Sequence, residues 1–347
     1  MDLSKVSHAD WSAACKQCRI SSIYLDPRWL QLIEEVYPRL KIVRLVCRDD
    51  AGRVSWLLPL VEIMPLGKKS PMLISLPFGN YGGFLLPADV DKIDREALLP
   101  LAGFFEKSRA FALELREAEE PVPGFEASDT FKRFEIVFPE TTEDLWKRVI
   151  TGNARTSVRK AEKAGVEVVY DYADGVSVYQ QIYEKNASQH GTPIHHLSWF
   201  YKLDELFSRE SEIILGKIGD HFVGALLILH YRGRAILHAA VSDPDFRTIP
   251  VTDRLLWGAF DRIMAVGASK SFDFGRTRPD PGKLFFKRKW GGKEKTLYYS
   301  YLTKPGAVIP QIVPENPKLR LGIKAWQLLP MAVKRRLGPL FRVRIPT

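Results

Sequence analysis

The spacing of apolar positions predicts a helix followed by two strands near the start of the chain. Trp29, Leu32, Ile33 and Val36 recur at steps of three and four residues, as on one face of an amphipathic helix. Apolar runs at 42–47 and 54–63 then flank a polar turn at 49–52. These two runs predict a β-hairpin behind the helix.

The same pattern returns in the second half. Trp199, Leu203 and Leu206 mark a helix, and apolar runs at 213–218 and 222–230 flank the turn Gly219-Asp220. Trp199 precedes Asp220 by as many positions as Trp29 precedes Asp50. The recurrence predicts two copies of one α/β unit, although a single internal match of this kind also arises by chance.

The change from one unit to the next is expected where a strand at 131–137 gives way to a helix introduced by Thr141, Thr142 and Glu143. We therefore expect domains at 1–139 and 140–304, followed by a tail at 305–347. The predicted fold class is α/β (α+β), with mixed sheets flanked by helices.

Composition narrows the class of protein. The 347 residues are 46% hydrophobic and 27% charged, which excludes an extended low-complexity or disordered chain. The net charge of +10 lies mainly in the tail, because no acidic residue follows Glu315 and the body is nearly balanced. A general nucleic-acid-binding protein is therefore disfavoured. The basic tail residues are Lys318, Arg320, Lys324, Lys334, Arg335, Arg336, Arg342 and Arg344.

The tail predicts a basic amphipathic element. Pro310, Pro314 and Pro317 make a broken linker, and helical segments follow at 319–329 and 331–337. Leu319, Ile323, Trp326 and Leu329 form an apolar stripe, and Trp326, Leu328 and Leu329 are the candidates for insertion into a membrane. We expect reversible contact with an anionic membrane surface. The alternative is that the apolar residues pack back onto the body.

No membrane span is evident in the sequence, because the longest uncharged run, 70–88, is broken by prolines and glycines. No secretory signal is evident either, because residues 1–11 include charged side chains and lack a continuous apolar stretch. Cys15, Cys18 and Cys47 make an odd count without a regular framework, which favours a reducing compartment. We expect a cytoplasmic protein. If the tail binds lipid, the protein also makes peripheral contact with the inner face of the membrane. We assign no metal, although His8 and the three thiols leave a zinc site as an alternative.

Two neighbouring segments carry candidate chemistry. Residues 280–292 predict a short helix with Asp280 as N-cap, and Lys283 and Lys287 lie on one face of it. Just before it, 271–276 predicts a buried strand that opens into a polar loop. The alternative for this helix is a solvated lysine face above an aromatic anchor formed by Phe286 and Trp290.

Several arginines are candidates for binding phosphate. Arg155, Arg159 and Lys163 form a cationic helical stripe, for which a plain solvated face is the alternative. Arg247 precedes a helix at 255–264 whose N-terminal amides suit a phosphate. Arg276 is the further candidate.

Three motifs in this order resemble the FemAB family. They are Asn-x-Arg-x-x-x-Arg-Lys-Ala-x-x-x-Gly-Val at 153–166, Phe-Asp-Phe-Gly-Arg at 272–276 and Phe-Lys-x-x-Trp-Gly at 286–291. The loops at 75–83 and 191–193 resemble, more narrowly, the branch associated with bacterial exosortase (PEP-CTERM) and exopolysaccharide systems. The resemblance covers about residues 20–303.

The resemblance implies two tandem GNAT-like acyltransferase domains. Peptidoglycan members of the family transfer an amino acid from aminoacyl-tRNA to an amine of a cell-wall precursor, and related branches resemble acyl-CoA-dependent N-acyltransferases. We therefore expect an N-acyltransferase with an acyl-CoA or aminoacyl-tRNA donor and an amine acceptor on a cell-envelope or exopolysaccharide precursor. The long helical arm of some peptidoglycan members is missing, which weakens the case for tRNA. The alternative is a non-catalytic binding protein that recruits polysaccharide or tRNA components.

The resemblance also assigns site residues. Lys287 matches the lysine that polarises the reacting carbonyl. Asp273 is the candidate for orienting or deprotonating the amine, with pairing to Arg276 as the alternative. Tyr298 or Tyr299, with Tyr299 preferred, is the candidate for protonating the leaving group, although one of them is expected in the core. The expected substrate-binding residues are Tyr81, Gly82, Gly83, Arg155, Arg159, Arg247, Gly275, Arg276, Phe286 and Trp290.

Overall fold

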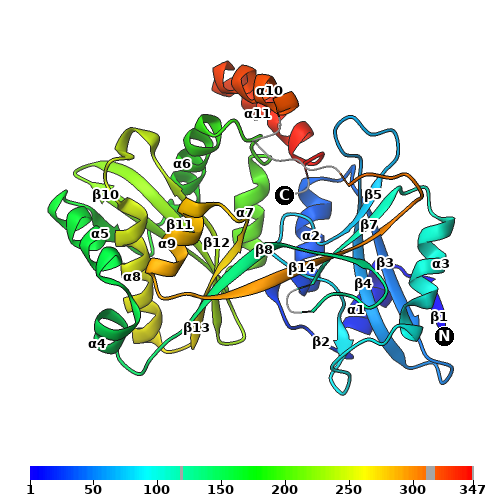
Figure 1. Cartoon of the computed structure of the whole chain (residues 1–347). Coiled ribbons are helices and arrows are strands. Elements are labelled where there is room, and N and C mark those ends of the chain that lie inside the picture. Colours follow the sequence, from blue (N-terminus) through cyan, green and yellow to red (C-terminus); the bar gives the residue numbers. More distant parts are fainter. Residues whose placement is uncertain (118–119, 310–316, 346–347) are drawn as a thin grey trace. The chain divides into compact units, whose positions relative to one another are not determined.

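The computed structural model describes residues 1–117, 120–309 and 317–345. The chain divides into two compact units (Figure 1). Unit 1 comprises Met1–Phe131, Thr296–Val313 and Leu340–Thr347, and unit 2 comprises Lys132–Lys295 and Pro314–Pro339. Strands β8 (Glu126–Val137) and β14 (Lys293–Thr303) each begin in one unit and end in the other.

Unit 1 is built on strands in the order β1-β3-β4-β5-β7-β14. A separate pair joins β2 to β6. The strands are β1 (Asp2–Lys5), β2 (Cys18–Arg19), β3 (Lys41–Arg48), β4 (Val54–Ile63), β5 (Met72–Ser75), β6 (Leu86–Pro87) and β7 (Ala112–Glu117). The helices are α1 (His8–Cys15), η1 (Ile23–Leu25), α2 (Pro27–Val36), η2 (Glu96–Leu98) and α3 (Leu99–Lys107).

Unit 2 is built on strands in the order β8-β13-β12-β11-β10-β9. The strands after β8 are β9 (Glu167–Val169), β10 (Ser211–Ile218), β11 (His221–Tyr231), β12 (Arg234–Ser242) and β13 (Ser271–Thr277). The helices are α4 (Thr142–Asp144), η3 (Leu145–Val149), α5 (Gly152–Lys163), α6 (Gly175–Gln189), α7 (Ser198–Leu206), η4 (Pro244–Phe246), α8 (Val251–Val266), α9 (Pro281–Lys289) and α10 (Pro317–Leu328). Helix α11 (Met331–Arg342) follows and ends in unit 1.

The two units share one topology. In unit 1, α2 leads into antiparallel β3, β4 and β5, and α3 then returns the chain to β7, which pairs parallel with β5. In unit 2, α7 leads into antiparallel β10, β11 and β12, and α8 returns the chain to β13, parallel to β12. The α/β fold of two tandem units that the repeated pattern predicts is therefore confirmed.

Apolar side chains of strands and helices form the core of each unit. In unit 1, Trp56 and Leu58 of β4 pack with Leu101 and Phe105 of α3. In the core of unit 2, buried apolar side chains of helices α5 and α8 pack with those of strands β11 and β13. Each sheet thus buries a strand face against a helix stripe, as an α/β layer requires.

The predicted helix at 280–292 is α9, and its ends follow local rules. The Asp280 carboxylate accepts a hydrogen bond from the Lys283 amide at 2.8 Å, which caps the first turn. Gly291 ends the helix at φ +81°, and a Cβ there would lie 2.7 Å from the Val149 carbonyl oxygen. Only glycine suits this position without movement of the neighbouring backbone.

The expected domain limits at 1–139, 140–304 and 305–347 stay a prediction. The predicted tail helices correspond to α10 and α11, whereas Pro310 and Pro314 lie outside the described residues. No helix in the described ranges is long and apolar enough to cross a membrane. The same ranges hold no group of three or more histidine, cysteine, aspartate or glutamate side chains arranged to hold a metal ion.

Candidate active site

Lys287 occupies the centre of the candidate site in unit 2. Helix α9 returns along β13, and the Lys287 ammonium donates hydrogen bonds to the Phe274 and Gly275 carbonyl oxygens, both at 2.8 Å. The side chain is 9% exposed, and its Nζ lies 5.9 Å from the centre of the Phe134 ring. A cation is therefore held against strand β13 in a mostly buried position.

The two carbonyls accept these bonds because β13 is bulged. In the β8–β13 ladder Asp273 pairs with Glu135, and the next pair is Arg276 with Arg133, so the register shifts between them. Gly275 has φ +68°, a left-handed conformation that favours glycine. Such a bulge releases backbone groups from the ladder and redirects them.

Asp273 fixes the bulge from inside. Its carboxylate is fully buried, accepts the Gly275 amide at 2.8 Å through Oδ1, and pairs through Oδ2 with the Arg133 guanidinium at 3.2 Å. Both carboxylate oxygens are thus engaged by the protein. Arg133 is itself 1% exposed, so this is a buried ion pair.

Burial changes the acidity of Lys287. Loss of hydration lowers the pKa of the Lys287 ammonium to about 8, and the Asp273 carboxylate opposes this shift. The positive charges of Lys283 and Arg276 lower the pKa further. The ammonium form therefore predominates at neutral pH. Two of its three hydrogens go to carbonyls, and the third has no acceptor among the described residues.

Strand β12 stops pairing with β13 just before Phe274 and Gly275. Parallel pairing of β12 with β13 runs only from Arg234–Ser271 to Ile236–Asp273, although β12 continues to Ser242. Phe274 and Gly275 thus lie beyond the last β12–β13 pair. The structure brings Lys287, Asp273, Gly275 and Arg276 together at this point.

Unit 1 fills the equivalent place with its own chain. There β5–β7 pairing ends at Ile74–Glu114, and Gly82 then bridges to Arg116. The Ser75 hydroxyl donates to the Gly82 carbonyl at 2.7 Å and accepts the Arg116 amide at 2.9 Å. The loop at 76–83 is therefore bonded into the sheet.

The aromatic residues predicted to bind substrate in α9 have clear packing contacts. Trp290 is fully buried, and its indole donates to the Asp253 carboxylate at 3.0 Å. Phe286 packs against the core of unit 2 and lies under the Lys289 ammonium at 4.9 Å. Their place in the substrate site stays a prediction.

The predicted phosphate-binding arginines are spread over unit 2. Arg155 donates to the carbonyls of Trp146 and Ile150 at 2.9 and 2.7 Å, so it fixes the turn before α5. Arg159 stacks on the Trp146 ring at 5.7 Å, and Arg247 is exposed at the approach to α8. Of the four arginines, Arg276 is the one whose charge acts on Lys287.

The remaining predicted residues lie in unit 1. Tyr81, Gly82 and Gly83 are buried, and the Tyr81 ring meets Tyr24 edge-on at 5.6 Å. Tyr299 is 1% exposed, with the Phe131 ring at 4.6 Å and the Arg116 guanidinium at 5.4 Å. A substrate or catalytic role for these four residues stays a prediction.

Sequence reasoning missed Arg133 and Phe134 of β8. Arg133 lies 140 positions before its partner Asp273, and no motif joins the two segments. The sequence around Arg133 offers no clear signal, because Lys132 and Glu135 on either side are charged as well, and burial of Arg133 is seen only in the structure.

Comparison with known proteins places these residues within a recognised domain. The acetyltransferase (GNAT) domain family matches residues 150–288, a range that includes β12, β13 and Lys287. None of the curated proteins is similar enough in sequence to count as a relative.

Solved structures are similar over most of the chain. FemX has 13% identity and a TM-score of 0.59 over 86% of this chain and 97% of its own. A tandem GNAT protein from the clavulanic acid biosynthesis pathway has 10% identity and a TM-score of 0.55 over 88% and 99%. The C-terminal domain of a putative lysylphosphatidylglycerol synthetase from Agrobacterium fabrum has 12% identity and a TM-score of 0.55 over 86% and 93%. The likeness shows a shared tandem GNAT fold.

Proposed function

We propose that the protein is an N-acyltransferase that forms an amide between an activated acyl or aminoacyl donor and an amine acceptor. The GNAT match at 150–288 supports acyl transfer, and the tandem fold shared with FemX supports a FemAB-like arrangement. The observation that carries the proposal is the Lys287 ammonium, held at the β13 bulge with one hydrogen left for a ligand.

This geometry suits the charge that develops during amide formation. The neutral acceptor amine attacks the carbonyl carbon of a thioester or ester, and the carbonyl oxygen becomes an oxyanion. A fixed ammonium in a poorly hydrated site stabilises that oxyanion more strongly than water does. The intermediate then collapses: the carbonyl re-forms, the C–S or C–O bond of the donor breaks, and the new C–N bond remains. The proton lost by the amine balances the one gained by the leaving group, which departs as a thiol or alcohol.

We assign Asp273 a positioning role in this site. Because both of its oxygens are engaged with Gly275 and Arg133, its contacts support a role in holding the bulge and, through it, the carbonyls that bind Lys287. Direct orientation or deprotonation of the amine by Asp273 requires a movement that brings the amine to this fully buried carboxylate. Tyr299 remains the proposed proton donor to the leaving group.

The substrates are proposed at the level of class. One similar structure is described as a tandem GNAT protein without AcCoA, and another belongs to a putative lysylphosphatidylglycerol synthetase. These names support an acyl-CoA or aminoacyl-tRNA donor, respectively. The acceptor that we propose is an amine-bearing cell-envelope or exopolysaccharide precursor. The exosortase-associated branch rests on the sequence motifs at 75–83 and 191–193.

A non-catalytic binding protein is the second candidate, and the buried Glu114–Arg116 pair favours it for unit 1. Arg116 Nε donates to Glu114 Oε1 at 2.7 Å beside the loop at 76–83, so the described residues of unit 1 hold an ion pair and a bridging loop where unit 2 has the bulge and Lys287. Unit 1 then serves as a scaffold. In unit 2, the position of Lys287 favours a catalytic role.

The test has two stages. Mass spectrometry of ligands that co-purify with the native protein identifies the donor class, and we expect a coenzyme A species or a charged tRNA. Transfer of that donor's acyl group to an amine is then measured for Lys287→Ala and for the exposed neighbour Lys283→Ala. We expect at least about a hundredfold loss for Lys287→Ala, as for removal of an oxyanion donor. Lys283→Ala should keep most of the activity, and unchanged turnover of folded Lys287→Ala contradicts the mechanism.

A further inference from the structure

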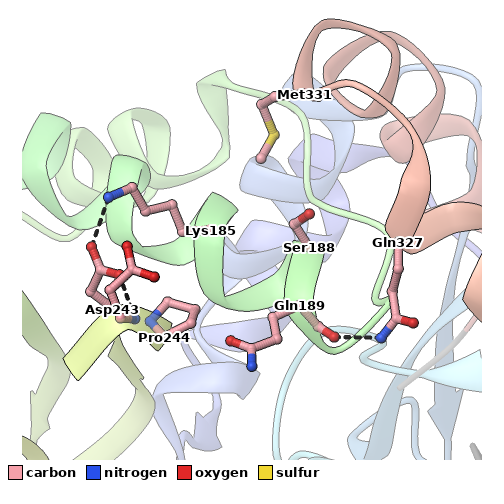
Figure 2. Close-up of a pocket in the computed structure, with 8 residues that line it drawn as sticks. Lys185, Ser188, Gln189, Asp243, Pro244, Gln327 and Met331 are labelled. Carbon is pink, nitrogen blue, oxygen red and sulfur yellow. Dashed lines mark hydrogen bonds and ion pairs between the residues drawn. The ribbon is translucent and has the colours of Figure 1, made fainter. Parts of the chain in front are cut away.

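One face of α10 is fixed to unit 2. Trp326 is 9% exposed, and a Cβ on Gly191 would lie only 2.5 Å from Cγ2 of Ile323, so the helix lies close against that backbone. The Gln327 amide donates to the Gln189 carbonyl oxygen at the end of α6 (Figure 2). Gln327 and Met331 also line a pocket of about 530 Å³ beside Lys185 and Ser188.

Helix α11 is anchored next to it. The Lys334 ammonium is 2% exposed and donates to the Ser188 hydroxyl and the Gln327 carbonyl oxygen. Arg335 pairs with the buried Glu184 carboxylate at 2.7 Å. A Cβ on Gly338 would lie 2.7 Å from Ile194, so α11 also lies close against unit 2. The orientation of both helices on unit 2 is therefore set, up to Pro339.

The opposite face of α10 is apolar and uncovered. Leu321 and Leu328 are 78% and 87% exposed, the two highest values for large apolar side chains in the described part of the chain. Their spacing of two helical turns places them on one face, with Lys324 between them. Trp326 and Ile323 lie on the other face, so the leucines cannot turn inward without breaking the anchor.

The two tail helices also carry uncompensated positive charge. Lys324 of α10 and Arg336 of α11 are exposed, and neither forms an ion pair with any described residue. No acidic residue follows Glu315 in the sequence. We call Leu321, Lys324, Leu328 and Arg336 the tail face.

We propose that the tail face docks on an anionic phospholipid surface. The basic side chains meet lipid phosphates, and Leu321 and Leu328 enter the boundary between headgroups and acyl chains. A nucleic acid satisfies the cations but leaves both leucines in water, which is why the pairing of leucine with lysine favours lipid. The sequence pointed to Trp326 as an inserting residue, but the structure turns Trp326 inward and Leu321 outward.

Flotation of the full-length protein with vesicles tests this proposal. We expect binding to phosphatidylglycerol-containing vesicles at low salt and little binding to pure phosphatidylcholine. Leu321→Gln with Leu328→Gln should weaken binding at least about tenfold, because the apolar insertion is lost. Lys324→Gln with Arg336→Gln should weaken it about twentyfold and reduce its salt dependence. The matched control is Leu99→Gln with Val266→Gln, two exposed apolar residues elsewhere, which should leave binding unchanged.

Three results overturn the proposal. They are absence of flotation with anionic vesicles at low salt, equal flotation of the tail-face and control variants, and a dimer in sedimentation that Leu321→Gln with Leu328→Gln dissociates while vesicle binding is absent. All replaced side chains are exposed, so unchanged thermal unfolding of each variant is the folding control. Acyl transfer between soluble substrates does not depend on the outcome.

Discussion

Lys287 shows how burial adjusts one side chain to a task. With a pKa of about 8, the Lys287 side chain is mostly protonated at neutral pH and loses its proton at slightly higher pH. In the proposed role of oxyanion donor, Lys287 acts in the protonated form, so the rate of the chemical step should fall as pH rises through about 8. Lys283→Gln removes a positive charge that lowers the pKa of Lys287. The fall in rate at alkaline pH, the alkaline limb of the pH–rate profile, should then move to higher pH.

The pH dependence of turnover at saturating substrate measures both effects. Lys287→Arg provides the control, because arginine stays charged throughout this range and the limb should disappear even if the rate is lower. A limb that persists unchanged in Lys287→Arg belongs to another group, such as the acceptor amine.

Among the elements, strand β13 depends on the buried pair between Asp273 and Arg133. Asp273→Asn keeps the shape and the bond to the Gly275 amide but removes the charge that faces Arg133. Loss of one partner from a buried ion pair destabilises a protein by about 3–5 kcal/mol. Urea unfolding of Asp273→Asn should show a loss of this size, and Asp273→Leu with Arg133→Met should recover much of it. A stable but inactive Asp273→Asn instead supports direct proton transfer.

In the whole molecule, the paths of β8 and β14 decide what can fold alone. Tyr298–Thr303 of β14 complete the ladder beside β7 in unit 1, and Lys132–Val137 of β8 complete the ladder beside β13 in unit 2. A fragment 1–139 therefore lacks a strand and exposes the edge of β7. We expect this fragment to aggregate, and fragment 140–304 to lose the Arg133–Asp273 pair and the bulge.

Expression of 1–139, of 140–304 and of both together measures this dependence. Recovery of soluble, cooperatively unfolding protein only on co-expression is the expected result. A monomeric fragment 1–139 with a sharp thermal transition establishes the sequence-based boundary as a true folding limit instead.

The sequence by itself determined the features that depend on neighbours along the chain. The repeated helix and hairpin follow from periodicity, α9 follows from Asp280 and Gly291, and the positive tail follows from the absence of acidic residues after Glu315. Lys287 was reached through a local motif. Each of these signals spans only a few helical turns or strand residues, so no knowledge of distant packing was needed.

Only the tertiary structure decided which distant groups meet. It paired Asp273 with Arg133, ended the β12–β13 ladder beside Gly275, and turned Trp326 inward while Leu321 faces outward. The physical reason is that burial and ion pairing depend on the surface against which a segment packs. Helical periodicity places Trp326 and Leu321 on their faces of α10, but the close approach at Gly191 selects which face is covered.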